Sequence, residues 1–332
     1  MKDGKIRPVI TGTGSYLPDK IMDNHHLACL VDTSDEWIRS RTGIRERRIL
    51  APEMATSDMC VIAAQKALEN AGMDPADLDL IVVGTITPDM VFPSTACLVQ
   101  HRLGAHQAAA FDLSAGCTGF IYALAVGSQF LLAGTYQRAL IIGADALSRV
   151  TNWNDRNTCV LFGDGAGAVV LEAAAAEEGL LGFYLGSEGS GAEVLCQPAG
   201  GSRLPASEET IAANLHTIHM EGKEVFKFAV KVMGEAALKV LAQCGMTQND
   251  VDFLIPHQAN IRIVEAALKR LELSADKVYV NLDRYGNMSC ASVPVALDEA
   301  VREGKISKGD LVLLVAFGAG LTWGSAALRW AK

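Results

Sequence analysis

The sequence predicts an α/β fold made of two similar halves. Two short apolar segments, 79–84 (DLIVVG) and 139–143 (ALIIG), are typical of parallel strands buried on both faces. The segment KALENAGMDPADLDLIVV, from Lys66, matches KVLAQCGMTQNDVDFLIP, from Lys239, without gaps at an offset of 173 residues. Each copy reads as a helix that ends at glycine, an acidic turn and a buried strand. A duplicated α/β unit explains the match.

The duplication also predicts the domain organisation. We expect two halves, about 1–180 and 181–332, packed with pseudo-two-fold symmetry. The same offset carries Cys117 onto Cys290. Residues 185–222 lack strong periodicity, so we interpret them as a long surface loop on the substrate side.

Composition narrows the function. The chain has 332 residues, half of them hydrophobic, and a net charge of −9, which argues against a nucleic-acid-binding protein. Its eight cysteines form no CxxC pair and lie near no histidine cluster, so we expect reduced thiols without a metal site. No convincing membrane span and no signal-peptide pattern are present. We therefore expect a cytoplasmic protein with no membrane partner.

Local signals place further elements in chain order. Residues 7–15 read as a strand that ends in a glycine turn, and Ser34 begins a helix with acidic residues in its first turn. Apolar periodicity predicts a helix over 57–71, closed by Gly72. Residues 160–172 read as a glycine loop that enters a strand.

Cys117 lies between a short apolar strand and a helix. Apolar residues recur at three- and four-residue spacing after it, and Gly134 supplies the helix stop. Unpaired amides and the dipole at a helix start favour an anion, so we expect the pKa of this thiol to be lowered. The alternative is a small hydrophobic side chain in a packed turn, which is how most buried cysteines behave.

Two other loops carry polar side chains beyond predicted strands. His257 follows the buried strand 253–255, and Asn260 can cap the next helix. Asn287 follows a glycine turn. Taken singly, the histidine could be a structural hydrogen-bonding group and the asparagine a turn residue. Because duplicated α/β sheets place reactive groups in loops at strand ends, we expect both to approach Cys117.

Five motifs in order resemble the thiolase-fold condensing enzymes, above all β-ketoacyl-[acyl carrier protein] synthase III: SAGCTGF, GDGAGAVVLE, PHQANIRI, YGNMSCASVPVALDEA and AFGAGLTWGSAALR. The likeness begins at TSDEWIRSRTGIRERR and covers essentially the whole chain. It implies a thiolase-like fold whose βαβ halves form a layered αβαβα sandwich. It also implies a catalytic triad of Cys117, His257 and Asn287, with an oxyanion hole formed by the amides of Cys117 and Ala319.

The resemblance implies a reaction as well. A short acyl-CoA primer acylates Cys117, and malonyl-[acyl carrier protein] then loses CO₂ and attacks the acyl group to give 3-ketoacyl-[acyl carrier protein] and start fatty acid synthesis. Acyl-CoA is a substrate, and no cofactor is bound permanently. We expect His257, largely neutral, and Asn287 to donate N–H groups to the enolate oxygen.

The resemblance also assigns substrate and partner contacts. It implies that coenzyme A binds through Trp37, which would stack on the adenine. Arg41 and Arg156 would contact the phosphates and the base, and Gly222 and Asn260 the pantetheine. Phe92 matches a residue that, in the family, reaches across a dimer interface into the acyl pocket of the partner subunit. The resemblance therefore implies a homodimer.

A basic helix face is expected to bind the acidic acyl carrier protein. Arg262, Lys269 and Arg270 have the spacing of one helix face, and Lys227 is expected to join them.

Several readings stay open at this point. The chain could be a secondary-metabolism paralogue, or an acyltransferase that forms C–O or C–N bonds. A Cys-His-Asn peptidase or amidase is disfavoured by the chain-wide duplication, and a non-catalytic binding protein by the intact triad. A thiolase would need a second cysteine where this chain has Phe317. Met288, Cys290 and Ala319 depart from residues common in the family, which leaves the acyl preference open.

Overall fold

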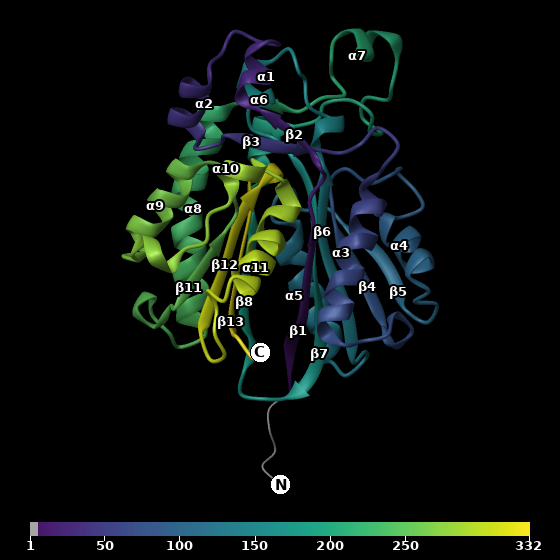
Figure 1. The fold of residues 1–332 in the computed structure, drawn as a ribbon, viewed down its shortest axis with the longest axis vertical. Coiled ribbons are helices and arrows are strands. Elements are labelled where there is room, and N and C mark those ends of the chain that lie inside the picture. The colour runs from purple at the N-terminus through teal and green to yellow at the C-terminus, as the bar shows by residue number, and fades with distance from the viewer. Residues whose placement is uncertain (1–5) are drawn as a thin grey trace.

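Two large β-sheets and three layers of helices give the described part of the chain five layers in the order α, β, α, β, α (Figure 1). The computed structural model describes residues 6–332. The first sheet has the order β1 (Ile6–Tyr16), β7 (Asp164–Ala175), β6 (Arg138–Ala146), β4 (Leu80–Gly84) and β5 (Ala109–Leu113). The second has the order β11 (Phe253–Pro256), β12 (Leu311–Gly318), β13 (Thr322–Arg329) and β8 (Gly179–Ser187).

The second sheet repeats the first, strand by strand. The order β8-β13-β12-β11 corresponds to β1-β7-β6-β4, with the same alternation of antiparallel and parallel pairs. Where β5 continues the first sheet, the second has only a parallel bridge between Leu254 and Val278. The predicted α/β fold with duplicated halves is confirmed. The boundary predicted near residue 180 falls at the start of β8, and the division into 1–180 and 181–332 stays a prediction.

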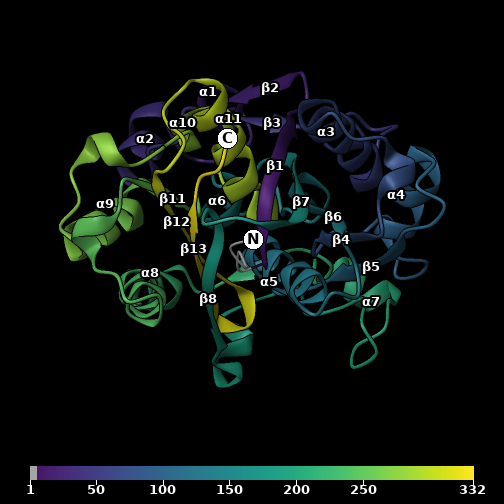
Figure 2. The same ribbon diagram turned by 90° about the horizontal axis from the view of Figure 1, so that it is seen from below.

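Two helices lie between the sheets, α5 (Gly119–Leu132) and α11 (Ser292–Arg302), as the view from below also shows (Figure 2). Their side chains form one buried core with both sheets, to which α5 contributes Phe120 and Leu124 and α11 contributes Val293 and Leu297. Burial from both sides explains why α5 is apolar around nearly its whole circumference.

Outer helices cover the remaining faces of the sheets. The first sheet carries α3 (Thr56–Ala71) and α4 (Thr95–Leu103), and the second carries α8 (Gly222–Gln243) and α9 (Ile261–Leu271) (Figure 1). The abundance of glycine and alanine follows from this close packing. A Cβ on Gly14 of β1 would lie 2.5 Å from the carbonyl oxygen of Ala63 in α3, so only glycine fits there.

Short elements cover the end of the molecule at which the parallel strands finish (Figure 1). They are β2 (Lys20–Asp23), α1 (Asn24–Ala28), α2 (Asp35–Thr42), β3 (Glu46–Ile49), α6 (Arg156–Cys159), β9 (Leu195–Cys196), α7 (Glu208–Ala212), β10 (His219–Met220) and α10 (Leu282–Tyr285). The interpretation of 185–222 as one long loop was incomplete, because β9, α7 and β10 interrupt it. Over residues 6–332, we find no helix with the length and apolarity that a bilayer crossing requires.

Candidate active site

Three loops bring Cys117, His257 and Asn287 to one pocket, as the sequence predicted. Cys117 follows β5, His257 follows β11, and Asn287 follows the short helix α10. The pocket has a volume of about 100 Å³, and Phe162 and Phe317 are among its lining residues. All three polar side chains are buried. Their convergence gives the site its reactive groups.

Cys117 sits in a turn that is packed against the loop after β12. Gly116 has a φ of 57°, and a Cβ on it would lie 2.5 Å from the amide nitrogen of Ala319. A Cβ on Gly318 would overlap the amide nitrogen of Cys117. The backbones of the two predicted oxyanion-hole residues are therefore in close contact.

Thr322 ties the two loops together. Its Oγ1 lies 2.9 Å from Thr118 Oγ1, 3.0 Å from the Ala115 carbonyl oxygen and 3.2 Å from that of Ala319. All these groups belong to the turns that carry Cys117 and Ala319. Thr322 was not among the residues predicted from the sequence, although its position two residues after the FGAG turn was a signal.

The thiol of Cys117 is less acidic than the sequence predicted. Burial raises its pKa to about 12, a hydrogen bond from Ser289 acts in the opposite direction, and the charge of Asp145 raises it further. The predicted direction, a lowered pKa at the helix start, was therefore wrong for the substrate-free chain. The reason is that loss of hydration penalises the thiolate more than the helix start and Ser289 favour it. Attack by this sulfur requires a nearby proton acceptor.

His257 offers such an acceptor. Its Nδ1 lies 2.6 Å from Ser292 Oγ, and its ring packs edge-on against Phe317 with 5.4 Å between ring centroids. Its other nitrogen, Nε2, is buried and has no hydrogen-bond partner within the described chain. Burial lowers the pKa of His257 to about 3, so the imidazole is neutral at physiological pH.

Asn287 has its side chain oriented by the backbone that follows. Its Oδ1 accepts a hydrogen bond from the Ser289 amide at 2.9 Å. The Asn287 amide donates to the Leu161 carbonyl at 2.8 Å, and its carbonyl accepts from the Gly163 amide at 3.0 Å. With Oδ1 engaged, the Nδ2 protons are the groups that Asn287 can offer to a substrate.

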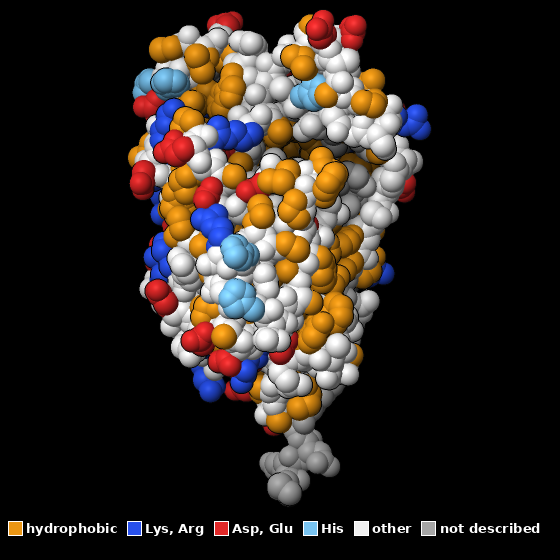
Figure 3. Space-filling view, turned by 90° about the vertical axis from the view of Figure 1, so that its right-hand side faces the viewer, with side chains coloured by type: hydrophobic (Ala, Val, Ile, Leu, Met, Phe, Trp, Pro, Cys, Tyr) orange, Lys and Arg blue, Asp and Glu red, His pale blue; other side chains and the backbone are white. Residues whose placement is uncertain are grey.

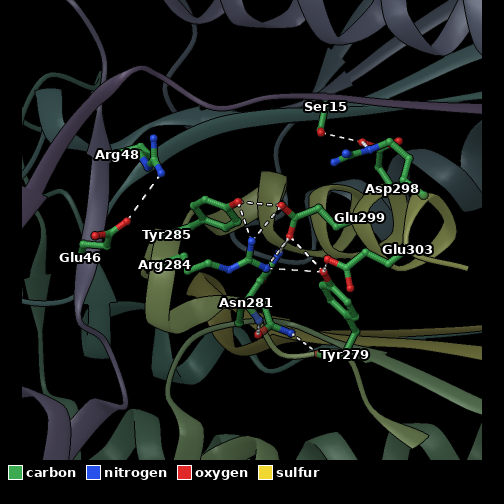
Figure 4. Close-up of polar contacts among 12 residues, drawn as sticks. Ser15, Glu46, Arg48, Tyr279, Asn281, Arg284, Tyr285, Asp298, Glu299 and Glu303 are labelled. Carbon is green, nitrogen blue, oxygen red and sulfur yellow. Dashed lines mark hydrogen bonds and ion pairs between the residues drawn. The ribbon is translucent and has the colours of Figure 1, made fainter. Parts of the chain in front are cut away.

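A buried acid supports the loops of His257 and Asn287 (Figure 4). Glu299 of α11 accepts hydrogen bonds from Tyr285 Oη at 2.6 Å and Asn281 Nδ2 at 2.8 Å. The Asn281 amide in turn donates to Oε1 of Gln258, the residue after His257, at 3.3 Å. One carboxylate thus connects both loops. Glu299 was not among the residues predicted from the sequence, although an acid within the apolar run VPVALDEAV was a signal.

The neighbouring acid on α11 joins the two halves of the chain. Asp298 accepts a hydrogen bond from Ser15 Oγ at 2.6 Å (Figure 4). It also accepts one from Thr13 Oγ1 at 2.8 Å, and both donors belong to β1. Arg302 lies 3.1 Å from the same carboxylate. Because β1 belongs to the first sheet, this contact fixes α11 relative to the half that carries Cys117.

Two further cavities adjoin the Cys117 pocket. A mostly apolar chamber of about 180 Å³ is lined by Cys117 and Ala319 together with Ile86, Leu147, Val150 and Ile218. An outer cavity of about 820 Å³ includes Trp37 and Arg41. It shares five lining residues with the Cys117 pocket, which are Leu161, Met220, Gly222, Phe226 and Asn260. The arrangement leads from the surface, past Cys117, to an apolar end.

The residues predicted to bind coenzyme A gather around this outer cavity. Trp37, Arg41, Gly222 and Asn260 line it. The guanidinium groups of Arg41 and Arg156 lie over the Trp37 ring, 5.6 and 4.9 Å from its centroid. Asn260 caps α9 by accepting from the Arg262 amide at 2.9 Å, and its Nδ2 donates to the Arg41 carbonyl at 3.0 Å.

The predicted basic face is divided in the structure. Lys227 and Arg262 line the outer cavity, although Lys227 also pairs with Glu224 at 2.6 Å. Lys269 is exposed on α9. Arg270 packs against α8, pairs with Glu235 at 3.3 Å and lines a different cavity. The prediction that all four basic residues share one face was therefore wrong for Arg270, because its long side chain turns toward the neighbouring helix α8.

Phe92 lies at the surface, away from the cavities around the Cys117 of its own chain. It is 83 % exposed, and its neighbour Val91 is 87 % exposed. This loop precedes α4 on the side of the molecule that also carries β5, the edge strand of the first sheet. Hydrophobic side chains gather on that side (Figure 3). Among residues 6–332, no cluster of three or more His, Cys, Asp or Glu side chains is placed to hold a metal ion.

Comparison with known proteins agrees with this geometry. The family model for the C-terminal part of 3-oxoacyl-[acyl-carrier-protein] synthase III matches residues 241–330, and that for 3-oxoacyl-[acyl-carrier-protein] synthase III matches residues 111–189. A β-ketoacyl-[acyl-carrier-protein] synthase III from Caldanaerobacter subterraneus subsp. tengcongensis is 62 % identical over 99 % of both chains.

Two solved structures extend the comparison. The 3-oxoacyl-[acyl-carrier-protein] synthase III of Aquifex aeolicus superposes with a TM-score of 0.90 at 46 % identity, over 98 % of this chain and 100 % of that one. The priming β-ketosynthase of the R1128 polyketide biosynthetic pathway superposes at 0.91 with 34 % identity, over 100 % and 99 %. The chain therefore belongs to the 3-oxoacyl-[acyl-carrier-protein] synthase III family.

Proposed function

We propose that the chain condenses a short acyl-CoA primer with malonyl-[acyl carrier protein], releases CoA and CO₂, and so initiates fatty acid synthesis. One observation carries the proposal: the pocket of Cys117, His257 and Asn287 adjoins a small apolar chamber and also a large outer cavity lined by Trp37 and Arg41. The chamber suits a short acyl group, and the outer cavity suits the nucleotide part of the primer.

The first half-reaction transfers the acyl group to Cys117. The sulfur attacks the thioester carbonyl while its proton leaves, and CoA departs with a proton. The amides of Cys117 and Ala319 would hold the oxyanion, and one such donor is typically worth about 10²–10³ in rate. Because the thiol pKa is raised, Nε2 of the neutral His257 is the natural acceptor of the thiol proton.

The second half-reaction forms the carbon–carbon bond. The malonyl group loses CO₂, the enolate attacks the acyl carbonyl, and Cys117 leaves as a thiolate that is reprotonated. Asn287 donates from Nδ2 to the enolate oxygen, since its Oδ1 is occupied by the Ser289 amide. Asparagine does not titrate, so this donor is available at any working pH. A second donor in His257 stays a prediction, because it requires a proton on Nε2.

The outer cavity would hold both carriers in turn. Arg41 and Arg156 beside the Trp37 indole suit a purine base with phosphates, and Gly222 and Asn260 lie where the cavity joins the Cys117 pocket. Lys227 and Arg262 on its rim, with Lys269 nearby on α9, suit an acidic acyl carrier protein. The pairing of Arg270 with Glu235 weakens its share in docking.

The side of the molecule that carries β5 supports a homodimer. Among residues 6–332 this strand has no neighbour beyond it in the sheet, and exposed edge strands readily pair with another chain. The exposed Val91 and Phe92 on the same side provide apolar surface for a second copy. In such a dimer Phe92 would reach the acyl chamber of its partner, as the resemblance implies.

The remaining properties follow from this chemistry. Each step uses side chains and backbone amides alone, so we expect no permanently bound cofactor. Acyl-CoA and acyl carrier protein are soluble cytoplasmic carriers, which supports a cytoplasmic location with no membrane or nucleic-acid partner.

A product assay tests the proposal. Malonyl-[acyl carrier protein] is incubated with a panel of acyl-CoA primers, and 3-ketoacyl product is measured for the wild type and for Cys117→Ser. Product that depends on Cys117 and forms with a short primer is expected. Acylation of Cys117 without condensation would favour a transferase with another acceptor, as in the secondary-metabolism alternative. Release of free acid from acyl-CoA, with no label retained on the protein, would favour a hydrolase.

A further inference from the structure

Asp145 is a fully buried carboxylate near the end of β6, and no sequence motif assigned it a role. The backbone amides of Ile86, Thr87 and Cys290 donate to it at 2.8, 3.1 and 3.0 Å. The hydroxyls of Thr85 and Thr87 donate at 3.0 and 2.9 Å. Burial of a carboxylate is costly unless hydrogen bonds replace its water, and these uncharged donors provide such bonds.

The two oxygens of Asp145 hold different segments of the chain. Oδ1 accepts from residues 85–87, which form the loop that follows β4. Oδ2 accepts from the amide of Cys290, which belongs to the turn before α11. The loop and the turn are far apart in the sequence, and one side chain connects them.

Both segments form walls of the apolar chamber beside Cys117. Ile86 lines the chamber from the loop, and Ser289, the residue before Cys290, lines it from the turn. Asp145 lies behind these walls and is not among the residues that line the chamber. The separation of Ile86 and Ser289 therefore depends on a side chain that an acyl group in the chamber would not touch.

The backbone of Ser289 needs support from its neighbours. Its φ is 47°, in the left-handed region, where residues other than glycine are strained. Its amide donates to Asn287 Oδ1 at 2.9 Å, and the following amide, that of Cys290, donates to Asp145. Loss of the bond to Asp145 should allow the turn to relax and to move away from the loop.

We propose that Asp145 is a positioning residue that holds Ile86 and Ser289 close together and so limits the length of the acyl primer that the chamber accepts. The inference deepens the proposed function and rests on it, because it names a determinant of primer length at the same site. The chamber has a volume of about 180 Å³, which suits a short acyl group. A wall that moves outward by about the width of one methylene admits a longer chain.

Asp145→Asn removes one acceptor and keeps the shape of the side chain. An amide accepts only on its oxygen. With that oxygen toward Ile86 and Thr87, two bonds from backbone amides are kept and one is lost, whereas the opposite orientation loses two. The NH₂ group therefore faces the Cys290 amide, and two donors lie against each other. We expect the turn that carries Ser289 to move away from the loop and to widen the chamber.

The test compares two primers with the full-length protein. The kcat/KM for 3-ketoacyl product is measured with acetyl-CoA and with hexanoyl-CoA, and the readout is the ratio of the hexanoyl to the acetyl value. For Asp145→Asn we expect this ratio to rise by at least about 10-fold, the size typical of one methylene in an apolar pocket. A ratio that is unchanged or lower overturns the inference. A merely structural role would lower both values together and leave the ratio unchanged.

Thr85→Val tests the same connection, and it decides the matter if Asp145→Asn does not fold. This change keeps the shape of the side chain and removes one donor to Oδ1, at 3.0 Å. We expect the ratio to rise several-fold, and an unchanged ratio would overturn the inference.

Asp79→Asn is the matched control. Asp79 is a half-buried carboxylate that accepts from the amides of Gln137 and Arg138 at 2.8 and 2.9 Å, and it lies before β4, at the opposite end of that strand from the loop. Its change should leave the ratio at the wild-type value, and a rise equal to that of Asp145→Asn would contradict the inference.

The same assay separates this inference from the proposed function. If the wild type forms no 3-ketoacyl product with any acyl-CoA, the proposed function fails, and the role of Asp145 fails with it. If the wild type forms product and the ratio is unchanged in Asp145→Asn, only the role of Asp145 fails.

Discussion

Gly318 and Cys117 are in direct backbone contact, although 201 positions separate them in the sequence (318 − 117). A Cβ on Gly318 would overlap the amide nitrogen of Cys117 and lie 3.1 Å from its Cα. The φ of Gly318 is −164°, which any residue adopts, so close contact rather than backbone strain explains the glycine.

Replacing Gly318 by alanine should therefore disrupt the oxyanion hole. The added methyl group pushes the Cys117 amide away from the Ala319 loop, and we expect the rate of Cys117 acylation to fall by at least about 10²-fold. The measurement is single-turnover transfer from acyl-CoA. Gly201→Ala is the control, because no atom lies within 4 Å of its added Cβ. Wild-type acylation by Gly318→Ala would show that the contact does not matter for catalysis.

The pH dependence of acylation should be flat near neutrality. Burial raises the pKa of Cys117 to about 12 and lowers that of His257 to about 3. Neither group therefore changes its charge at pH values between these two pKa values. We expect a nearly constant acylation rate from about pH 5 to pH 9. The rate should fall as the pH approaches 3, since protonated His257 cannot accept the thiol proton. An acylation rate that instead rises with a midpoint between about pH 6 and pH 8 would indicate a lowered thiol pKa and would contradict the raised pKa of Cys117.

Glu299→Gln should weaken both stability and turnover. Glu299 accepts from Tyr285, Asn281 and Arg284, and an amide accepts with only one oxygen. We expect a loss of about 1–3 kcal/mol in the free energy of unfolding, together with a lower kcat, measured by denaturant titration and the product assay. Glu303→Gln is the matched control, because Glu303 is exposed and accepts from Tyr279 alone, at 2.7 Å. Equal effects of both changes would argue against a special role for Glu299.

Arg262 and Arg270 should differ as docking residues. Arg262 lines the outer cavity, whereas Arg270 pairs with Glu235 and lines another cavity. Arg262→Glu should raise the apparent KM for malonyl-[acyl carrier protein] several-fold and spare priming by acyl-CoA, and Arg270→Gln should change both little. Steady-state kinetics with each substrate varied in turn provides the measurement. Equal loss of priming and condensation in Arg262→Glu would argue against docking.

Val91→Asp should weaken self-association. Val91 is 87 % exposed beside Phe92, and a carboxylate buried there against a second copy would be unpaired. We expect the wild type to sediment as a dimer and the variant to shift toward the monomer at the same concentration. The control is Ile211→Asp, since Ile211 is a similarly exposed aliphatic residue, at 64 %, on α7. A wild-type monomer would refute the proposed dimer directly.

Local pattern and repetition already determined much of this protein. The offset from Lys66 to Lys239 predicted the duplicated sheets, because each copy has the same helix, turn and buried-strand pattern. The strand-end positions of Cys117 and His257 predicted that these side chains would meet Asn287 in one pocket. Cys117 follows β5 of the first sheet and His257 follows β11 of the second, so their meeting depends on how the two sheets pack. The predicted strand end was wrong for Asn287, which follows the short helix α10.

Tertiary structure alone decided the properties that depend on burial and on contacts between distant segments. A helix start suggested an acidic thiol at Cys117, yet the packing around it removes the water that a thiolate needs. Spacing placed Arg262 and Arg270 on one face, yet α8 draws Arg270 away. Ser292, Glu299 and Thr322 have no motif of their own, and their partners come from other loops. A sequence pattern records which groups a residue carries, but desolvation and hydrogen bonding depend on which neighbours the fold brings to it.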